Sequence, residues 1–197
     1  MRLSSIAREE NRAKPFILLG HSMGSFAAQK YVLDHSDSIS GLVLSGSGVL
    51  DGLAHNTQST PPENILNAHF VPVRTPLDWL SRDAAAVNEF INDPLCFRFL
   101  EPSSAEAFLA ASAELADPIR LRHVRADLPI YLFSGSEDPV GQQLEGVRVL
   151  MGRYRDAGLR NISYDFYPGG RHEMLHETNR EEVVANLLLW ISRILPT

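Results

Sequence analysis

The chain of 197 residues has no apolar run approaching the roughly 20 residues of a membrane span, which argues against stable membrane insertion. Its single cysteine, Cys96, excludes a disulfide within the chain and is interpreted as a small buried apolar residue. It also lacks any run of Lys or Arg, and a net charge of -6 disfavours binding to nucleic-acid phosphates. The first residues become charged too soon for a secretory leader, so we expect a cytoplasmic location.

The remaining composition, 44% hydrophobic and 21% charged, is typical of a globular protein. Short apolar stretches, most of them without alternation, predict four buried parallel strands, at 16–19, 41–45, 129–134 and 162–167. Helices are expected over 25–35, 139–157 and 182–195, with Gly158 capping the second and a capping box at 178–181 opening the third. This order predicts an α/β fold with a mainly parallel sheet flanked by helices.

One long segment, 49–118, interrupts the alternation of strands and helices. It is rich in proline and contains two short helical patterns, 83–91 and 103–116. An insertion of this length is too long for a plain loop. We therefore predict a helical cap or lid at 49–118, with the core formed by 1–48 and 119–197.

The motif with the clearest chemistry is Gly20-His21-Ser22-Met23-Gly24, which matches the G-x-S-x-G nucleophile elbow. It lies between an apolar strand and a helix, as the elbow requires. A serine in such a strained turn leaves no room for bulky side chains two residues away, which explains Gly20 and Gly24. Ser22 is therefore the candidate nucleophile, and the Met23 N–H at the helix start is the candidate oxyanion donor.

A serine hydroxyl needs a positioned base, and the order Ser, Asp/Glu, His predicts where its partners lie. Asp138 follows the third strand and is the preferred acid, with Glu137 as the alternative. His172 follows the last strand on a glycine-rich loop and is the candidate general base. His21 is expected to pack beside the site.

A competing pattern, H-E-x-x-H, spans residues 172–176 and would indicate a zinc peptidase. That chemistry requires both histidines on one face of a stable helix. Glycines precede the motif and a new helix is expected just after it, so this alternative is disfavoured. We predict no metal site and no cofactor.

The sequence resembles the monoacylglycerol lipase/lysophospholipase-like (serine aminopeptidase-type) branch of the α/β-hydrolases. The resemblance is carried by the elbow, the strand 41–45, the cap stretches 75–83 and 92–96, and the loops 134–140 and 169–173. The resemblance implies hydrolysis of carboxylic esters, with a small lipophilic ester such as a monoacylglycerol or lysophospholipid as substrate. Within the cap, Trp79 is a candidate substrate contact, together with His21.

The chain departs from that family in one respect. The resemblance implies a half-sheet before the elbow strand, with a His-Gly loop that supplies a second oxyanion donor, and no His-Gly dipeptide occurs in the sequence. We therefore expect an amino-terminally truncated member, and a catalytically impaired hydrolase is the alternative function. Loss of one oxyanion donor costs about a hundred- to a thousand-fold in turnover.

Overall fold

A four-stranded parallel sheet forms the centre of the protein, in a computed structural model that describes residues 2–12, 14–52, 66–96 and 101–195. Its strands follow one another in chain order, and each pairs only with its neighbours in that order. The strands are β1 (Ile17–His21), β2 (Gly41–Ser45), β3 (Ile130–Gly135) and β4 (Ile162–Tyr167). The predicted α/β class is therefore confirmed, and β2 and β4 have the predicted bounds.

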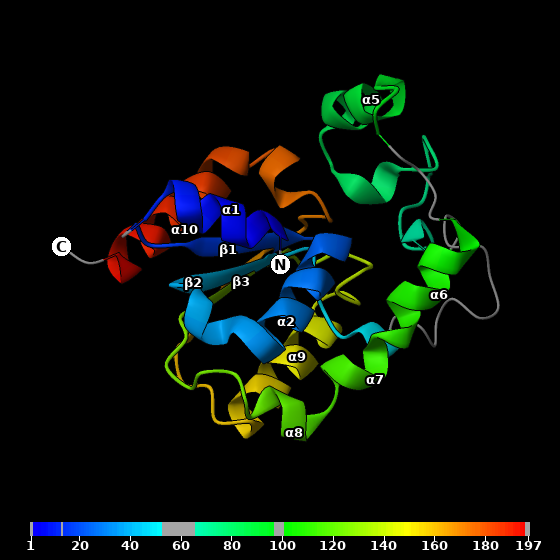
Figure 1. Cartoon of the computed structure of the whole chain (residues 1–197). Coiled ribbons are helices and arrows are strands. Elements are labelled where there is room, and N and C mark those ends of the chain that lie inside the picture. The colour runs from blue at the N-terminus through cyan, green and yellow to red at the C-terminus, as the bar shows by residue number, and fades with distance from the viewer. Residues whose placement is uncertain (1, 13, 53–65, 97–100, 196–197) are drawn as a thin grey trace.

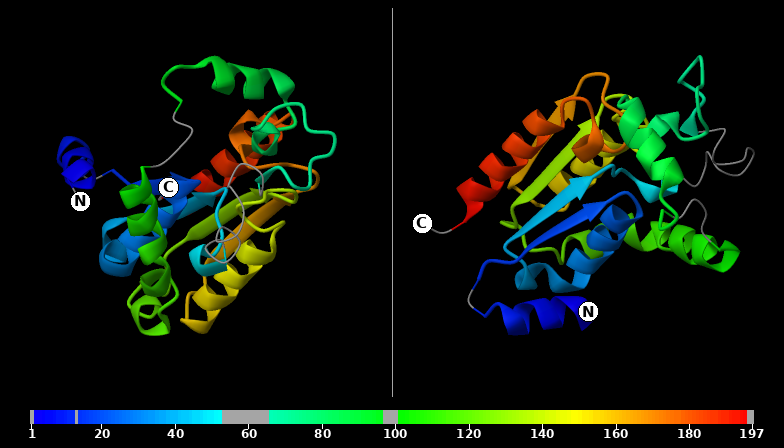
Figure 2. Two further views of the ribbon diagram at one scale, coloured as in Figure 1. Left: turned by 90° about the vertical axis from the view of Figure 1, so that its right-hand side faces the viewer. Right: turned by 90° about the horizontal axis from the view of Figure 1, so that it is seen from above.

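Helices cover both faces of this sheet (Figure 1). One face carries α2 and α9 and the other carries α10, while α1 lies beside the β1 edge (Figure 2). The core helices are α1 (Arg2–Glu10), α2 (Met23–His35), α9 (Glu145–Asp156) and α10 (Arg180–Ile194). The short 3-10 turns are η1 (Ser36–Ser38), η2 (Asp78–Leu80) and η3 (Met174–His176).

The two apolar cores follow from the alternation of side chains along the strands. Leu42, Leu44, Ile130 and Leu132 point into the core that α2 and α9 cover. Their neighbours Val43, Tyr131 and Phe133 point to the opposite face and pack against Val183, Leu187 and Trp190 of α10. Because β2 and β3 are buried on both faces, their sequences are continuously apolar.

Two predicted helix starts are wrong. The helix after β3 begins at Glu145, because Gln142, Gln143 and Leu144 adopt positive φ values of 53°, 49° and 75° that no α-helix accommodates. No capping box opens α10. Its N-cap is Asn179, and the Thr178 hydroxyl donates to the Glu177 carboxylate instead of capping the helix. Gly158 does end α9, with φ of 98°.

In the segment predicted as a cap, the described helix α5 (Ala84–Asn92) lies beyond the carboxyl ends of the strands (Figure 1). The described helices that follow are α6 (Pro102–Ala110), α7 (Ser112–Leu115) and α8 (Pro118–Leu121), the last of which begins where the predicted cap ends. Asp83 caps α5 by accepting bonds from Ala85 and Ala86, whereas the single helix expected at 103–116 is divided into α6 and α7. Cys96 is half-buried rather than buried. Within the described ranges, no helix has the length and apolarity needed to cross a membrane.

Candidate active site

Ser22 occupies the sharp turn between β1 and α2. Its φ of 52° and ψ of -126° lie in the left-handed half of conformational space, which costs a serine about 1–3 kcal/mol. The turn is held by a bond from the Ser22 N–H to the Ser45 carbonyl at 3.0 Å and by a bond from Ser25 Oγ to the Ser22 carbonyl at 2.6 Å. Met23 is the first residue of α2, where backbone N–H groups lack partners within the helix.

The two glycines of the elbow motif play different parts. A Cβ on Gly20 would lie 2.5 Å from the Gly24 carbonyl oxygen and 2.8 Å from Ala28 Cβ. A Cβ on Gly24 would meet no atom within 4 Å in the described chain. Gly20 is therefore needed because a larger side chain would not fit there. For Gly24 the predicted steric requirement is wrong, as judged from the described residues.

Asp138 and His172 form a buried pair at the carboxyl edge of the sheet. His172 Nδ1 lies 2.9 Å from Asp138 Oδ1, and the side chains are 1% and 0% exposed. Asp138 Oδ1 also accepts the Val140 N–H at 2.9 Å, which fixes the carboxylate. Glu137, the alternative acid, is exposed and bonds to Ser136 instead.

Close backbone contact brings the loops of this pair together. A Cβ on Gly135, at the end of β3, would lie 2.1 Å from the Gly170 carbonyl carbon. The Glu137 N–H bonds to the Gly170 carbonyl at 2.9 Å and ties the same two loops. Gly46 has φ of 54° and leaves room for the His172 ring, which a Cβ there would approach within 2.6 Å. The glycines thus place the imidazole against the end of β2.

His21 and Trp79 both pack against the His172 ring. The ring centroids of His21 and Trp79 are 4.8 Å and 4.9 Å from that of His172. His21 Nδ1 lies 3.2 Å from Ser45 Oγ, and its Nε2 lies 3.0 Å from Glu173 Oε1. His21 therefore packs beside the site, as expected from its position on the elbow.

Glu173 supplies a second negative charge beside the imidazole. Burial alone would raise the pKa of Glu173, but its bond to His21 and the nearby histidines lower that pKa to about 2. Burial alone would lower the pKa of His172, but Asp138 and then Glu173 raise it above the usual histidine value. Sequence reasoning missed this role, although Glu173 was visible in the H-E-x-x-H pattern.

Ser22 and His172 both follow strand ends at the carboxyl edge of the sheet. They are linked by His21, which precedes Ser22 and packs on the His172 ring. His172 Nε2 is buried and has no hydrogen-bond partner among the described residues, so no bond joins it to the Ser22 hydroxyl. An imidazole bonded through Nδ1 has only Nε2 left to accept a proton. The unpartnered Nε2 is therefore the ring nitrogen that is free to accept a proton.

The helix required by the zinc-peptidase pattern is not formed. His172 lies in a loop, and His176 belongs to the 3-10 turn η3. In the described residues, the cluster whose atoms could hold a metal consists of His21, His172 and Glu173, within 4.8 Å of one another, and does not include His176. The arrangement thus differs from the pair of histidines on one helix face that the zinc chemistry needs.

A pocket of about 360 Å³ adjoins the histidine loop on the side of α5. Glu173 and His176 form one wall, and Leu80, Val87 and Phe90 contribute apolar surface. It is therefore a partly apolar space next to the residue that follows His172.

Comparison with known proteins gives consistent matches. The family described as "Serine aminopeptidase, S33" matches residues 2–179. A monoacylglycerol lipase of Mycolicibacterium smegmatis is 26% identical over 192 residues, covering 96% of this chain. The chain spans 66% of the length of that relative.

Solved structures agree on the fold. A thermostable carboxyl esterase from Bacillus coagulans, in complex with glycerol, has a TM-score of 0.83 and 28% identity, covering 98% of this chain and 69% of that one. A monoglyceride lipase variant from Saccharomyces cerevisiae has a TM-score of 0.74 at 20% identity, covering 100% and 69% of the two chains, and shows the shared fold alone. From the family match, the parallel sheet and the serine elbow, this chain belongs to the serine aminopeptidase S33 family of α/β-hydrolases.

Proposed function

We propose that the protein is a serine hydrolase that cleaves carboxylic esters through an acyl-enzyme formed on Ser22. The observation that carries this proposal is the buried His172–Asp138 pair, at 2.9 Å, whose imidazole packs on His21, the residue before a serine held at positive φ on a strand-to-helix turn. These are the parts that acyl transfer requires: a presented hydroxyl, a base and a group that orients the base.

In the proposed reaction, Ser22 Oγ attacks the ester carbonyl while His172 Nε2 takes the serine proton. Asp138 accepts the Nδ1–H, which selects the tautomer with a free Nε2 and stabilises the imidazolium that forms. The alcohol leaves with the proton from His172, and water then repeats the sequence to release the acid. The Met23 N–H, at the positive end of α2, would donate to the developing oxyanion.

The proposed substrates are lipophilic esters such as monoacylglycerols or lysophospholipids. This proposal is supported by the similarity to a monoacylglycerol lipase and by the apolar residues of the pocket beside the histidine loop. Trp79 and His21 are proposed substrate contacts, because both rings pack on that of His172. Residues 49–118 are the proposed cap, because α5 lies beyond the carboxyl ends of the strands. The single cysteine fits a reducing compartment, so the cytoplasm is the proposed location.

The test compares hydrolysis of p-nitrophenyl butyrate by the wild type and by Ser22→Ala, with Ser192→Ala, an exposed serine on α10, as the control. Because Ser22 would form the covalent intermediate, its substitution should lower turnover by at least about 10⁴-fold, and Ser192→Ala should leave it unchanged. Equal rates for wild type and Ser22→Ala would reject the nucleophile. Absence of turnover and of fluorophosphonate labelling in both would favour the impaired-hydrolase alternative.

Substrate class is tested by comparing a monoacylglycerol, a lysophospholipid and a short peptide amide at equal concentrations. Turnover of the two lipid esters above the amide would support the proposal. Preference for the amide would replace the esterase assignment by a peptidase, since members of one fold can differ in substrate.

A further inference from the structure

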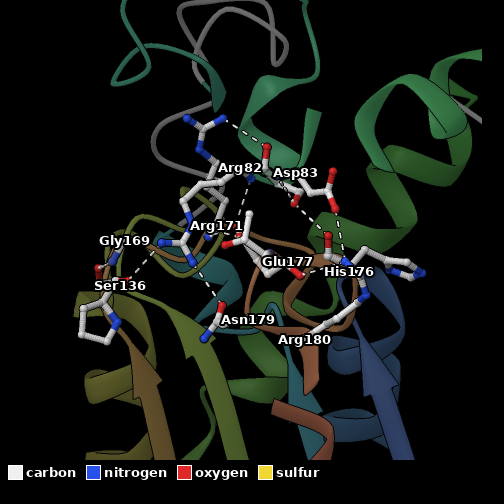
Figure 3. Close-up of polar contacts among 12 residues, drawn as sticks. Arg82, Asp83, Ser136, Gly169, Arg171, His176, Glu177, Asn179 and Arg180 are labelled. Atoms are coloured by element: carbon white, nitrogen blue, oxygen red, sulfur yellow. Dashed lines mark hydrogen bonds and ion pairs between the residues drawn. The ribbon is translucent and has the colours of Figure 1, made fainter. Parts of the chain in front are cut away.

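Glu177 is a fully buried carboxylate that the proposed reaction does not use. Its side chain is 0% exposed and lies five residues after His172, between the 3-10 turn η3 and α10. Burying a charged group is costly unless hydrogen bonds and charges compensate it. Figure 3 shows how Glu177 lies among polar groups from several segments.

Five donors from three parts of the chain satisfy this carboxylate. Oε1 accepts the backbone N–H groups of Arg82 at 3.0 Å and Arg171 at 2.9 Å. Oε2 accepts Arg82 Nε at 2.9 Å, the Thr178 N–H at 2.9 Å and Thr178 Oγ1 at 3.4 Å. One oxygen therefore joins a residue that precedes α5 to the residue directly before His172.

The bonds of Glu177 belong to a longer seam between residues 78–83 and the histidine loop. The His172 and Glu173 N–H groups bond to the carbonyls of Trp79 at 3.4 Å and Leu80 at 2.7 Å. Further bonds along the seam join Ser81 to His176, Arg82 to Asn179, Asp83 to Arg180, and Arg171 to Asp78. The backbone that carries the imidazole is thus anchored to the segment that carries Trp79.

The charge of Glu177 is maintained in this environment. Burial alone would raise the pKa of Glu177, but the N–H groups of Arg82, Arg171 and Thr178, followed by the Arg82 guanidinium, lower it below the usual value. An ionised carboxylate accepts all of these donors, whereas a neutral amide would turn an NH₂ group toward some of them. The seam therefore depends on a carboxylate at this position.

We propose that Glu177 is a positioning residue, which holds the His172 loop against residues 79–82 and thereby keeps the imidazole aligned with Asp138. The inference rests on the proposed function only in taking His172 as the base. It requires that loss of the carboxylate shift the ring while the fold persists.

The test uses Glu177→Gln, with Glu181→Gln as the matched control, because Glu181 is an exposed glutamate close by in the sequence, in the first turn of α10. A misplaced base should lower kcat on p-nitrophenyl butyrate about 10- to 100-fold with KM changed less than about twofold. Glu181→Gln should leave both constants unchanged. Circular dichroism and the thermal midpoint establish that each variant is folded at the assay temperature.

A spectroscopic measurement separates positioning from general stability. The proton of His172 Nδ1, bonded to Asp138, should give a downfield proton NMR signal in the wild type, assigned by its loss in Asp138→Asn. In folded Glu177→Gln this signal should weaken or broaden together with kcat. A lower thermal midpoint with the signal and kcat both retained would show that Glu177 is structural only and overturn the proposal.

Arg82→Gln provides a second variant if Glu177→Gln does not fold. It removes the side-chain donor but keeps the backbone N–H that bonds to Oε1, so a smaller loss of kcat, about 3- to 10-fold, and a weaker signal are expected. Unchanged kcat and signal in this variant would also contradict the proposal. If the wild type itself shows no hydrolysis, the NMR comparison still tests the position of His172, so the two proposals fail separately.

Discussion

The serine side and the histidine side of the proposed site are held by different kinds of structure. Ser22 is placed mainly by local structure, a strained turn at the end of β1, with one bond from its N–H to the Ser45 carbonyl of the neighbouring strand β2. His172 is placed by residues from distant parts of the chain: Asp138, Gly135 and Gly46 in the core, and the seam at 79–82. A local turn can be specified by a few adjacent residues, whereas a base that needs a defined tautomer requires long-range contacts.

The largest effect should come from Asp138→Asn, which breaks the histidine side at its centre. An amide cannot hold the imidazole in the tautomer that leaves Nε2 free, and we expect kcat to fall by about 10⁴-fold. Glu137→Gln is the matched control, because Glu137 is adjacent but exposed. A loss of similar size in the Glu137 variant, or little loss in the Asp138 variant, would reassign the acid.

A smaller effect is expected on the serine side from Gly20→Ala. The new Cβ would overlap the Gly24 carbonyl oxygen at 2.5 Å and Ala28 Cβ at 2.8 Å, so α2 must move away from β1. We expect about 2–3 kcal/mol of destabilisation, or a thermal midpoint lower by roughly 4–12 °C.

Gly24→Ala is the control for this comparison, because a Cβ there meets nothing within 4 Å of the described chain. An alanine in the first turn of α2 should be neutral or stabilise by up to about 1 kcal/mol. Equal destabilisation in the two variants, measured by thermal unfolding, would show that both glycines are sterically required.

The smallest effect concerns the pH dependence on the histidine side. The base must be neutral to accept a proton, so activity should fall as pH drops through the His172 pKa, which lies above the usual histidine value. Glu173→Gln removes one of the charges that raise this pKa, while its amide oxygen can still accept from His21. The acidic limb of the kcat/KM profile should therefore move to lower pH.

Glu137→Gln is again the appropriate comparison, since the exposed Glu137 side chain bonds to the neighbouring Ser136 and should not affect the limb. A shift of the Glu173→Gln limb to higher pH would contradict the assigned electrostatic role. An unchanged limb would mean that Asp138 alone raises the His172 pKa.

Local patterns predicted much of this architecture. Strands β2 and β3 are continuous apolar runs because both faces of the sheet are covered there. Asp83 and Gly158 mark helix ends by the capping chemistry of their own residue types. Sequence patterns gave wrong predictions where side chains bond to residues outside the pattern. Thr178 had the spacing of a helix cap, but its hydroxyl and N–H bond to Glu177, whose charge also binds Arg82.

The sequence by itself determined the class of fold, the serine turn and the order in which acid and histidine follow it, because apolar periodicity, glycine placement and strand ends are local properties. Only the tertiary structure decided that the Glu173 carboxylate raises the pKa of His172 and that Glu177 joins the histidine loop to residues 79–82. The bonds between the histidine loop and residues 79–82 link residues about 90 positions apart, such as Arg82 and Glu177 with a separation of 95. No local pattern encodes which buried carboxylate meets which distant N–H.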